Sequence, residues 1–169
     1  MSLTLKRILI FAGVLSAVIT LVIYLNSDRA LPESVRQDPN VIQLRFESWL
    51  PRLAVGGMTG LTIGHNVYIT LKKEQLNPCG SEGDRQFLKH ELIHVEQYEG
   101  QGMVDYVLGY YGGLFWNWIF SGFNAEEAYL KNAWEAYANY HQKEVLTLRE
   151  YQVVTRYYPQ CAGRLQWQK

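Results

Sequence analysis

The sequence predicts an α+β protein in which an N-terminal transmembrane helix precedes a small domain with a short antiparallel sheet and several helices. Residues 8–25 form an uncharged apolar run, which is typical of a helix that spans a bilayer. Residues 42–47 alternate apolar and polar side chains with the period of a half-buried strand, and residues 87–95 place apolar side chains at helical spacing. A chain of 169 residues provides one compact domain and an appendage.

The composition argues against two classes of protein. The chain is 48% hydrophobic, and its 16 Lys and Arg balance 16 Asp and Glu, so it does not have the composition of a disordered protein. A net charge of zero gives no broad positive field for phosphate backbones, which argues against nucleic acid as a partner. The 12 Tyr and 5 Trp favour a surface that meets a membrane or a ligand as well as water.

The run from Ile8 to Leu25 is predicted to be an uncleaved signal anchor. At about 1.5 Å per residue, a helix of this length just spans the hydrocarbon core of a bilayer. Lys6 and Arg7 precede the run, so the N-terminus is expected inside and the rest of the chain outside. The alternative is a cleaved signal peptide, which has a shorter apolar run and a small-x-small site that residues 24–26 do not provide.

Two strand regions are predicted after a linker that contains Pro32 and Pro39. The first strand is the alternating stretch at 42–47. After Pro51, residues 53–55, the glycine-rich 56–60 and residues 61–63 predict a strand, a turn and a second strand, which 67–69 continue past a bend at Gly64.

Three helical segments follow. The first is expected to begin at Ser81, whose hydroxyl caps the first turn with Asp84 three residues on, and to end at Gly100 or Gly102. The aromatic stretch 103–120 is interpreted as an interfacial or packed helical hairpin, an ordinary core segment or a second membrane span. A last long helix is predicted from Asn124 to about Leu148.

The C-terminal residues 149–169 give no clear pattern. The two cysteines, Cys79 and Cys161, are too few for a disulfide scaffold and lack C-x-x-C spacing. They are able to form one bridge if the domain lies in an oxidising compartment.

The segment from His90 to His94 carries the clearest chemistry. On a helix, residues four apart lie on one face, so the two imidazoles can bind one Zn²⁺ and leave positions for a third ligand and a water. Glu91 lies beside the first histidine. Its position on the helix is offset from the two ligands, so its carboxylate is expected to reach the water on the metal and not the metal itself. A carboxylate placed there is suited to act as general base and then to protonate a leaving amine.

The third metal ligand is predicted to be a downstream carboxylate, with Glu135 favoured over Glu127. Glu127 is three residues after the predicted cap Asn124, which gives it a separate role in the helix start. Glu135 shares its helix face with the small Ala138 and with Asn139, which is able to hydrogen-bond a ligand. The other candidates considered are Glu126, His141 and Glu144.

Two further positions are singled out near this motif. His65, on the predicted strand, is interpreted as a structural histidine, although an extended substrate could pair with that strand. Tyr98 or Tyr137 is suggested as a donor to the oxyanion of a tetrahedral intermediate, and the sequence does not select between them.

The segment 90–97, His-Glu-Leu-Ile-His-Val-Glu-Gln, followed by 135–139, Glu-Ala-Tyr-Ala-Asn, resembles zincin-like metallopeptidases of the gluzincin type, and most of all small uncharacterised bacterial domains with an H-E-L-x-H-V-x-Q helix. The segment 61–68 is similar to the strand before that helix. The resemblance covers roughly residues 50–142 and implies zinc held by His90, His94 and Glu135 with Glu91 as general base. It departs from the second motif N-P-x-E-x-E-A, because this chain lacks the Pro and the second Glu at 132–138.

With this resemblance, the chain divides into an anchor with flanks (1–30), a linker and first strand (31–50), a zincin-like metal-binding domain (51–148) and a tail (149–169). The leading hypothesis is a zinc metallopeptidase anchored in the inner membrane as a single-pass protein. Its domain would face the periplasm or the cell exterior and act on a peptide or protein substrate. The alternatives are an inactive zinc-binding interaction module of the cell envelope, and a membrane-embedded processing enzyme in which 103–120 also enters the bilayer.

Overall fold

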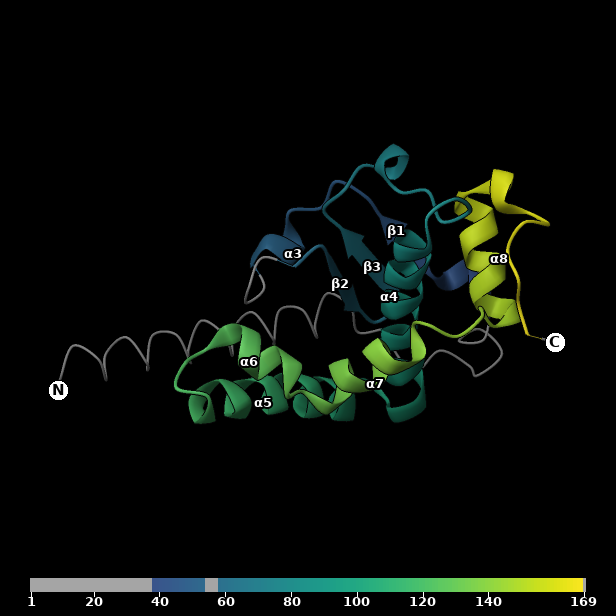
Figure 1. Cartoon of the computed structure of the whole chain (residues 1–169). Coiled ribbons are helices and arrows are strands. Elements are labelled where there is room, and N and C mark those ends of the chain that lie inside the picture. The colour runs from purple at the N-terminus through teal and green to yellow at the C-terminus, as the bar shows by residue number, and fades with distance from the viewer. Residues whose placement is uncertain (1–37, 54–57, 169) are drawn as a thin grey trace, which may run out of the picture. The chain divides into compact units, whose positions relative to one another are not determined.

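The computed structural model describes residues 38–53 and 58–168. The predicted anchor at 8–25, most of the linker, residues 54–55 of the predicted strand and residues 56–57 of the predicted glycine-rich turn lie outside these residues, so the structure does not test these predictions. The described part is an α+β domain with these elements (Figure 1): η1 Pro39–Val41, β1 Gln43–Arg45, α3 Leu50–Leu53, β2 Gly60–Ile63, β3 Asn66–Ile69, η2 Lys73–Gln75, α4 Glu82–Gln101, α5 Met103–Phe120, α6 Ala125–Leu130, α7 Ala133–His141, α8 Leu148–Tyr157 and η3 Pro159–Cys161.

The sheet has the strand order β1-β3-β2 and is mixed, whereas the sequence predicted an antiparallel sheet. Strands β2 and β3 form an antiparallel hairpin, with Leu61 opposite Tyr68, but β1 runs parallel to β3, with Leu44 opposite Val67. The chain leaves β1 through α3 and reaches the far side of β3 before it enters β2. Strand β3 therefore lies in the middle and has the same direction as β1.

Two local predictions in this region were wrong. Residues 67–69 do not continue β2 but form the separate strand β3, because Gly64 has a φ of +60° and reverses the chain in a tight turn. Leu53 belongs to the short helix α3 and not to a strand. Pro51 is accommodated in the first turn of that helix, and the Ser48 hydroxyl accepts a hydrogen bond from the Leu50 amide at 3.3 Å.

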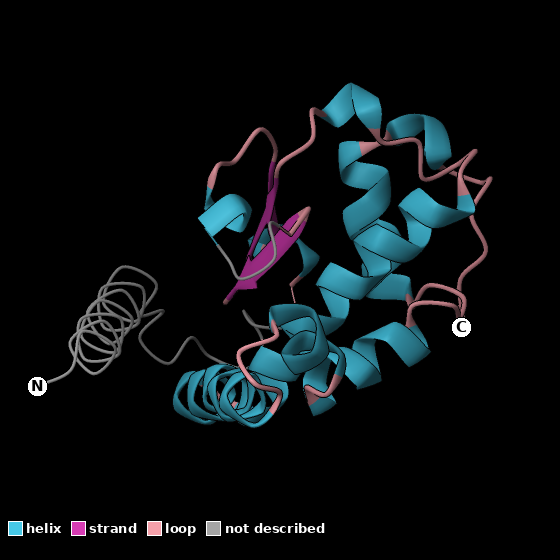
Figure 2. Ribbon diagram, turned by 60° about the vertical axis from the view of Figure 1, so that its left-hand side comes forward, coloured by secondary structure: helices cyan, strands magenta, loops and turns pink. Residues whose placement is uncertain are grey.

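Helix α4 begins and ends as predicted, although the Asp84 carboxylate accepts from the Asn77 amide at 2.8 Å and does not complete a capping box with Ser81. The Ser81 hydroxyl accepts a hydrogen bond from the Asp84 amide at 3.2 Å, and the helix ends at Gly102, which has a φ of +80°. The helix packs against β2, β3, α5, α7 and α8. Figure 2 shows the strands on one side of the described domain and most of the helices on the other. Helix α4 is thus the element on which a site can be assembled from distant parts of the chain.

The predicted long helix from Asn124 to Leu148 is broken into α6 and α7. Asn124 caps α6 as predicted, but Asn132 begins a new helix by accepting a hydrogen bond from the Trp134 amide at 3.0 Å. The break is favoured because an asparagine side chain competes for backbone groups inside a helix and is better placed at a cap. Helix α7 then ends at His141.

The C-terminal residues form helix α8, which the sequence analysis did not predict. Thr147 and Glu150 make a capping box, and Val153 and Val154 are buried in the core. The core is formed by apolar side chains of the sheet, α4 and α8, including Val67, Ile69, Leu88, Leu92, Val95, Val153 and Val154. A disulfide between Cys79 and Cys161 joins the loop before α4 to the segment after α8.

Helix α5 covers the aromatic stretch 103–120 and packs against α4 and α6. Within residues 38–53 and 58–168, no helix combines the length and the apolar character needed to cross a membrane.

Candidate metal centre

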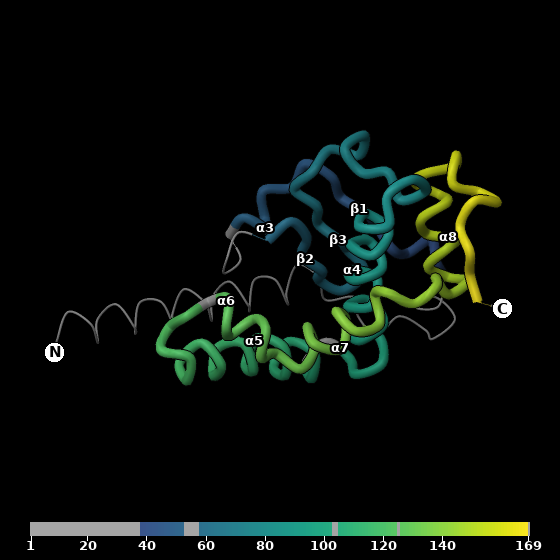
Figure 3. The backbone as a smooth tube through the Cα atoms, viewed as in Figure 1, coloured from purple at the N-terminus to yellow at the C-terminus, as the bar shows by residue number. Residues whose placement is uncertain are grey.

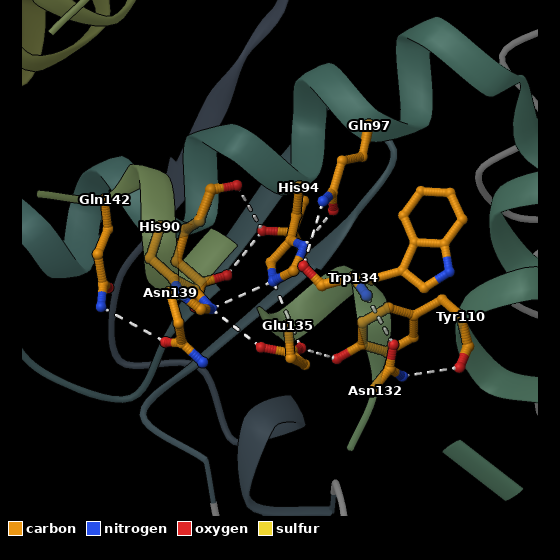
Figure 4. A network of polar contacts seen from close by, with 11 residues as sticks. His90, His94, Gln97, Tyr110, Asn132, Trp134, Glu135, Asn139 and Gln142 are labelled. Atoms are coloured by element: carbon orange, nitrogen blue, oxygen red, sulfur yellow. Dashed lines mark hydrogen bonds and ion pairs between the residues drawn. The ribbon is translucent and has the colours of Figure 1, made fainter. Parts of the chain in front are cut away.

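Helix α4 presents His90 and His94 on one face, as the spacing predicted. Leu88, Leu92 and Val95 fix the rotation of the helix because they are buried in the core. The two histidine side chains then point together, with their Nε2 atoms 3.2 Å apart, and both are buried. Figure 4 shows the two rings converging on the same point.

Glu135 of α7 completes the group, as the sequence analysis favoured. Its Oε2 lies 3.1 Å from Nε2 of His90, and its Oε1 lies 3.4 Å from Nε2 of His94. The side chain is almost fully buried, with 1% of its residue surface exposed. Among the described residues, His90, His94 and Glu135 are the cluster of histidine, cysteine and acidic side chains that is able to hold a metal ion.

The spacing of the three ligand atoms fits a tetrahedral metal site. Two ligands about 2.05 Å from a zinc ion at the tetrahedral angle are about 3.3 Å apart. The two Nε2 atoms are 3.2 Å apart, and they lie 3.1 and 3.4 Å from the two different oxygens of the Glu135 carboxylate, which is close to that value. One ligand atom from each of the three residues thus lies within 4.8 Å of the others, close enough for the three residues to share one metal ion.

The hydrogen bonds of Gln97 orient the His94 ring for metal binding. The Gln97 amide nitrogen donates to the Trp134 carbonyl at 3.2 Å, so the amide oxygen faces Nδ1 of His94 at 2.7 Å. Nδ1 must then carry the proton, which leaves a lone pair on Nε2 of a neutral ring. Nε2 lies 3.4 Å from Oε1 of Glu135, so either a proton on Nε2 or a metal ion must separate these two acceptors.

The electrostatics of the cluster also call for a positive charge. Burial alone would raise the pKa of Glu135, but hydrogen bonds from His90, His94 and Tyr110 lower it below its ordinary range. Burial would lower the pKa of His94, yet the Glu135 carboxylate raises it overall. The cluster thus holds a buried carboxylate whose charge is balanced by a proton or by a metal ion, and the two compete for the same atoms.

Further side chains hold the ligands in place. The Tyr110 hydroxyl of α5 donates to Oε1 of Glu135, and the Asn132 side chain donates to the Tyr110 carbonyl at 3.1 Å. Asn139, which the sequence analysis placed beside a ligand, accepts instead from Gln142 at 3.4 Å. Tyr110 had no local signal in the sequence, because it reaches Glu135 only through the packing of α5 against the metal helices.

Glu91 is held by strand β2. Its Oε2 accepts from the Thr62 hydroxyl at 2.7 Å, and the same hydroxyl is 3.1 Å from the Glu91 carbonyl. A Cβ on Gly60 would overlap Oε1 of Glu91, so only glycine allows this approach. Burial raises the pKa of Glu91, and the positive fields of His94 and His90 oppose that rise.

Two adjoining spaces surround these residues. An enclosed cavity of about 20 Å³ is large enough for one water or ion and is lined by Gly60, Leu61, Thr62, His90, Glu91, His94, Tyr106, Tyr110, Tyr129 and Glu135. A more open cleft of about 310 Å³ shares Gly60, His90, Glu91 and Tyr129 with that cavity and is also lined by Met58, Thr59, Gly83, Gln86, Phe87, Asn139 and Gln142. Glu91 and His90 therefore connect the metal cluster to a space that can admit a substrate.

The other candidate ligands lie elsewhere in the described domain. The Glu127 carboxylate pairs with Lys131 at 2.6 Å, and Glu144 pairs with His141 at 2.8 Å. Glu126 is exposed on α6. The sequence preference for Glu135 over Glu127 thus agrees with the cluster in the structure.

The two tyrosines suggested as oxyanion donors are not at the cleft. Tyr137 is exposed and its ring packs on His141, while Tyr98 is buried against His65. His65 itself contacts Glu99 at 2.8 Å, as fits a structural histidine. Tyr106, Tyr110 and Tyr129 line the enclosed cavity, and Tyr129 also lines the open cleft.

Comparisons of the chain with models of protein families, with curated proteins and with solved structures found no significant match. The geometry of the site is therefore the basis for a functional conclusion. It establishes a buried His-His-Glu group suited to hold a metal ion.

Proposed function

We propose that this chain is a zinc-dependent hydrolase of peptide bonds, anchored in the membrane by residues 8–25. His90, His94 and Glu135 would hold the metal ion, and Glu91 would act as general base. The observation that carries the proposal is that the two imidazoles and the Glu135 carboxylate lie 3.1–3.4 Å from one another, with Glu91 on the wall of the same cavity. A structural zinc site needs no such carboxylate beside it, whereas hydrolysis does.

The chemistry divides between the ion and the protein. When bound, zinc polarises the peptide carbonyl and makes water a better nucleophile. Glu91 takes a proton from the water while the oxygen of the water bonds to the carbonyl carbon of the peptide. It then gives that proton to the nitrogen of the leaving amine as the C–N bond breaks. The Thr62 hydroxyl holds the Glu91 carboxylate in position for both transfers. The Tyr129 hydroxyl is the candidate donor to the oxygen that gains negative charge.

A peptide substrate is favoured by the strand beside the site. β2 lies at the edge of the described sheet, and its residues Gly60, Leu61 and Thr62 line the enclosed cavity. An extended peptide could add to that edge through backbone hydrogen bonds. The open cleft also presents the carboxamides of Gln86, Asn139 and Gln142, which can donate to and accept from a peptide backbone.

The first test compares metal content and peptide cleavage in the full chain. The parent should contain about one zinc per chain, and Glu91→Gln should keep that zinc while cleavage of a peptide library falls by roughly 10²–10⁴. His94→Ala should lose the zinc, and a chelator should abolish cleavage by the parent. Glu127→Gln is the matched control and should change neither property, because Glu127 pairs with Lys131.

Two results would contradict the proposal at different points. Equal zinc content in the parent and His94→Ala would exclude this metal site. Equal turnover in the parent and Glu91→Gln would exclude Glu91 as general base.

A structural zinc site in an interaction module is the second candidate. The burial of all three ligands favours it, since the ion would then tie α4 to α7. Spectroscopy on the cobalt-substituted protein separates the two, because a closed four-ligand site favours structure and an exchangeable water favours catalysis.

A further inference from the structure

The far end of the hairpin formed by α5 and α6 exposes large apolar side chains. The exposed fraction is 57% for Trp116, 79% for Phe120 and 54% for Phe123. Trp116 and Phe120 lie one turn apart on α5 with their rings stacked, and Phe123 follows in the turn to α6 with its ring against Trp118. We call Trp116, Phe120 and Phe123 the aromatic tip. Figure 3 shows this turn at the end of the described domain that is opposite α8.

The part of the hairpin around the aromatic tip has no charged side chain, and several of its polar groups bond to one another. From Tyr106 to Ala125 the sequence contains no Asp, Glu, Lys, Arg or His. The Asn117 amide donates to the Ala128 carbonyl at 3.4 Å, and the Trp118 indole donates to the Phe123 carbonyl at 3.0 Å. The Ser121 hydroxyl donates to the Asn117 carbonyl at 2.6 Å. These polar groups therefore need not bond to water, which lowers the cost of moving the tip into a less polar medium.

The segment between the predicted anchor and the described domain is short. The predicted anchor ends at Leu25, and the described residues begin at Asp38. The connecting residues 26–37, even fully extended, span at most about 40 Å. If residues 8–25 span a bilayer as proposed, Asp38 lies no farther than this from it, so the bilayer is the partner that we consider for the exposed aromatic surface.

We propose that the α5–α6 hairpin docks on the lipid–water interface of the membrane that holds the anchor, with the aromatic tip in the headgroup layer. Tryptophan and other aromatic side chains favour that layer because their flat apolar rings lie there with their polar edges hydrated. The helical rise places Tyr110, which contacts Glu135, about 15 Å from Phe120 along α5. If the proposed hydrolase function holds, the peptide bonds within reach are those close to the membrane surface.

The test measures tryptophan quenching in the full chain, reconstituted in phosphatidylcholine vesicles with or without brominated acyl chains. Trp116→Tyr should roughly halve the emission that brominated lipid quenches, since Trp116 and Trp118 are the tryptophans of the hairpin. Trp49→Tyr is the matched control, because Trp49 is 63% exposed but lies outside the hairpin. It should leave the lipid-quenched emission unchanged.

Aqueous iodide separates the remaining outcomes. Docking predicts that iodide quenches Trp49 strongly and Trp116 weakly. Equal lipid quenching in the two variants, or strong iodide quenching of Trp116, would overturn the proposal. Protection of Trp116 from both quenchers would also overturn it, because a second protein surface would then cover the tip. Both variants should keep the zinc content of the parent, so the result does not depend on the metal centre.

Discussion

At the scale of single residues, the site depends on side chains that are buried yet charged. Glu135 and Glu91 are both carboxylates within one small cavity, but their surroundings push their pKa values in opposite directions. Glu135 receives hydrogen bonds from three side chains and stays ionised, which suits a metal ligand. Glu91 receives one from Thr62 and has a raised pKa, which suits a group that must take up and release a proton.

Gly60 should be essential for the position of Glu91. A methyl group in Gly60→Ala would overlap the Glu91 carboxylate and lie 3.0 Å from Phe87. We expect a loss of about 1–3 kcal/mol in unfolding free energy and a fall of at least about tenfold in peptide cleavage. Zinc content should stay unchanged. Urea unfolding measures the change in stability, and a peptide-cleavage assay measures the change in activity.

Gly100→Ala provides the control for this substitution. It lies on α4 with nothing within 4 Å of the added Cβ, so cleavage should remain at the level of the parent. Full cleavage activity in Gly60→Ala would show that Glu91 tolerates displacement or has no role.

At the scale of elements, α7 owes its position to one capping residue. Asn132 caps the helix through the Trp134 amide and also donates to the Tyr110 carbonyl, so it links the start of α7 to α5. Glu135 lies in the first turn after this cap. The cap therefore affects the metal centre as well as the stability of the helix.

Asn132→Ala is expected to reduce the unfolding free energy by about 1–2 kcal/mol and the zinc affinity by about tenfold. Asn124→Ala removes the comparable cap of α6 and should cost about 1 kcal/mol without a change in zinc affinity. Competition with a zinc chelator measures affinity, and urea unfolding measures stability. The same zinc affinity in both variants would mean that the cap of α7 does not position Glu135.

At the scale of the whole molecule, two cross-links hold the C-terminal segment to the rest of the described domain. The disulfide Cys79–Cys161 spans 82 residues of sequence. Arg149 of α8 pairs with Glu99 of α4, which also contacts His65 in the turn between β2 and β3. The segment after residue 148 is therefore part of the folded domain.

Removal of the disulfide should destabilise the protein substantially. The double variant Cys79→Ser, Cys161→Ser is expected to lose about 2–4 kcal/mol in unfolding free energy, since the bridge restricts the unfolded chain. Urea unfolding with and without reductant checks this. The parent should become less stable in reductant, and the double variant should not respond. Equal stability of parent and variant without reductant would contradict a bridge in the folded protein.

Acid should weaken the contact at Glu99. Burial raises the pKa of Glu99, but Arg149 and His65 lower it overall below the ordinary carboxyl value. A lowered pKa means that the unfolded state binds the proton more readily, so the stabilisation is complete above about pH 4.5 and is lost as the pH falls through the folded pKa. The unfolding free energy of the parent should fall between about pH 7 and about pH 3, and in Glu99→Gln it should fall by less; urea titrations at the two pH values measure both. An equal fall in both proteins would exclude Glu99 as its source.

The sequence was most informative where the evidence is local. The spacing of His90 and His94, the cap at Ser81 and the alternation around Leu44 each depend on neighbours within a few residues, and the structure agrees with them. The break at Asn132 is also local, but it was missed because the high helix propensity of the alanines on both sides favoured one long helix.

What the sequence by itself determined is a helix that carries two histidines and a glutamate with the spacing of a metal motif. Only the tertiary structure decided which distant carboxylate joins them, that Tyr110 supports it, and that β1 runs parallel to β3. The reason is physical. Backbone caps and helical periodicity act over a few residues, whereas the approach of α7 and α5 to α4 depends on how whole elements bury their apolar faces against one another.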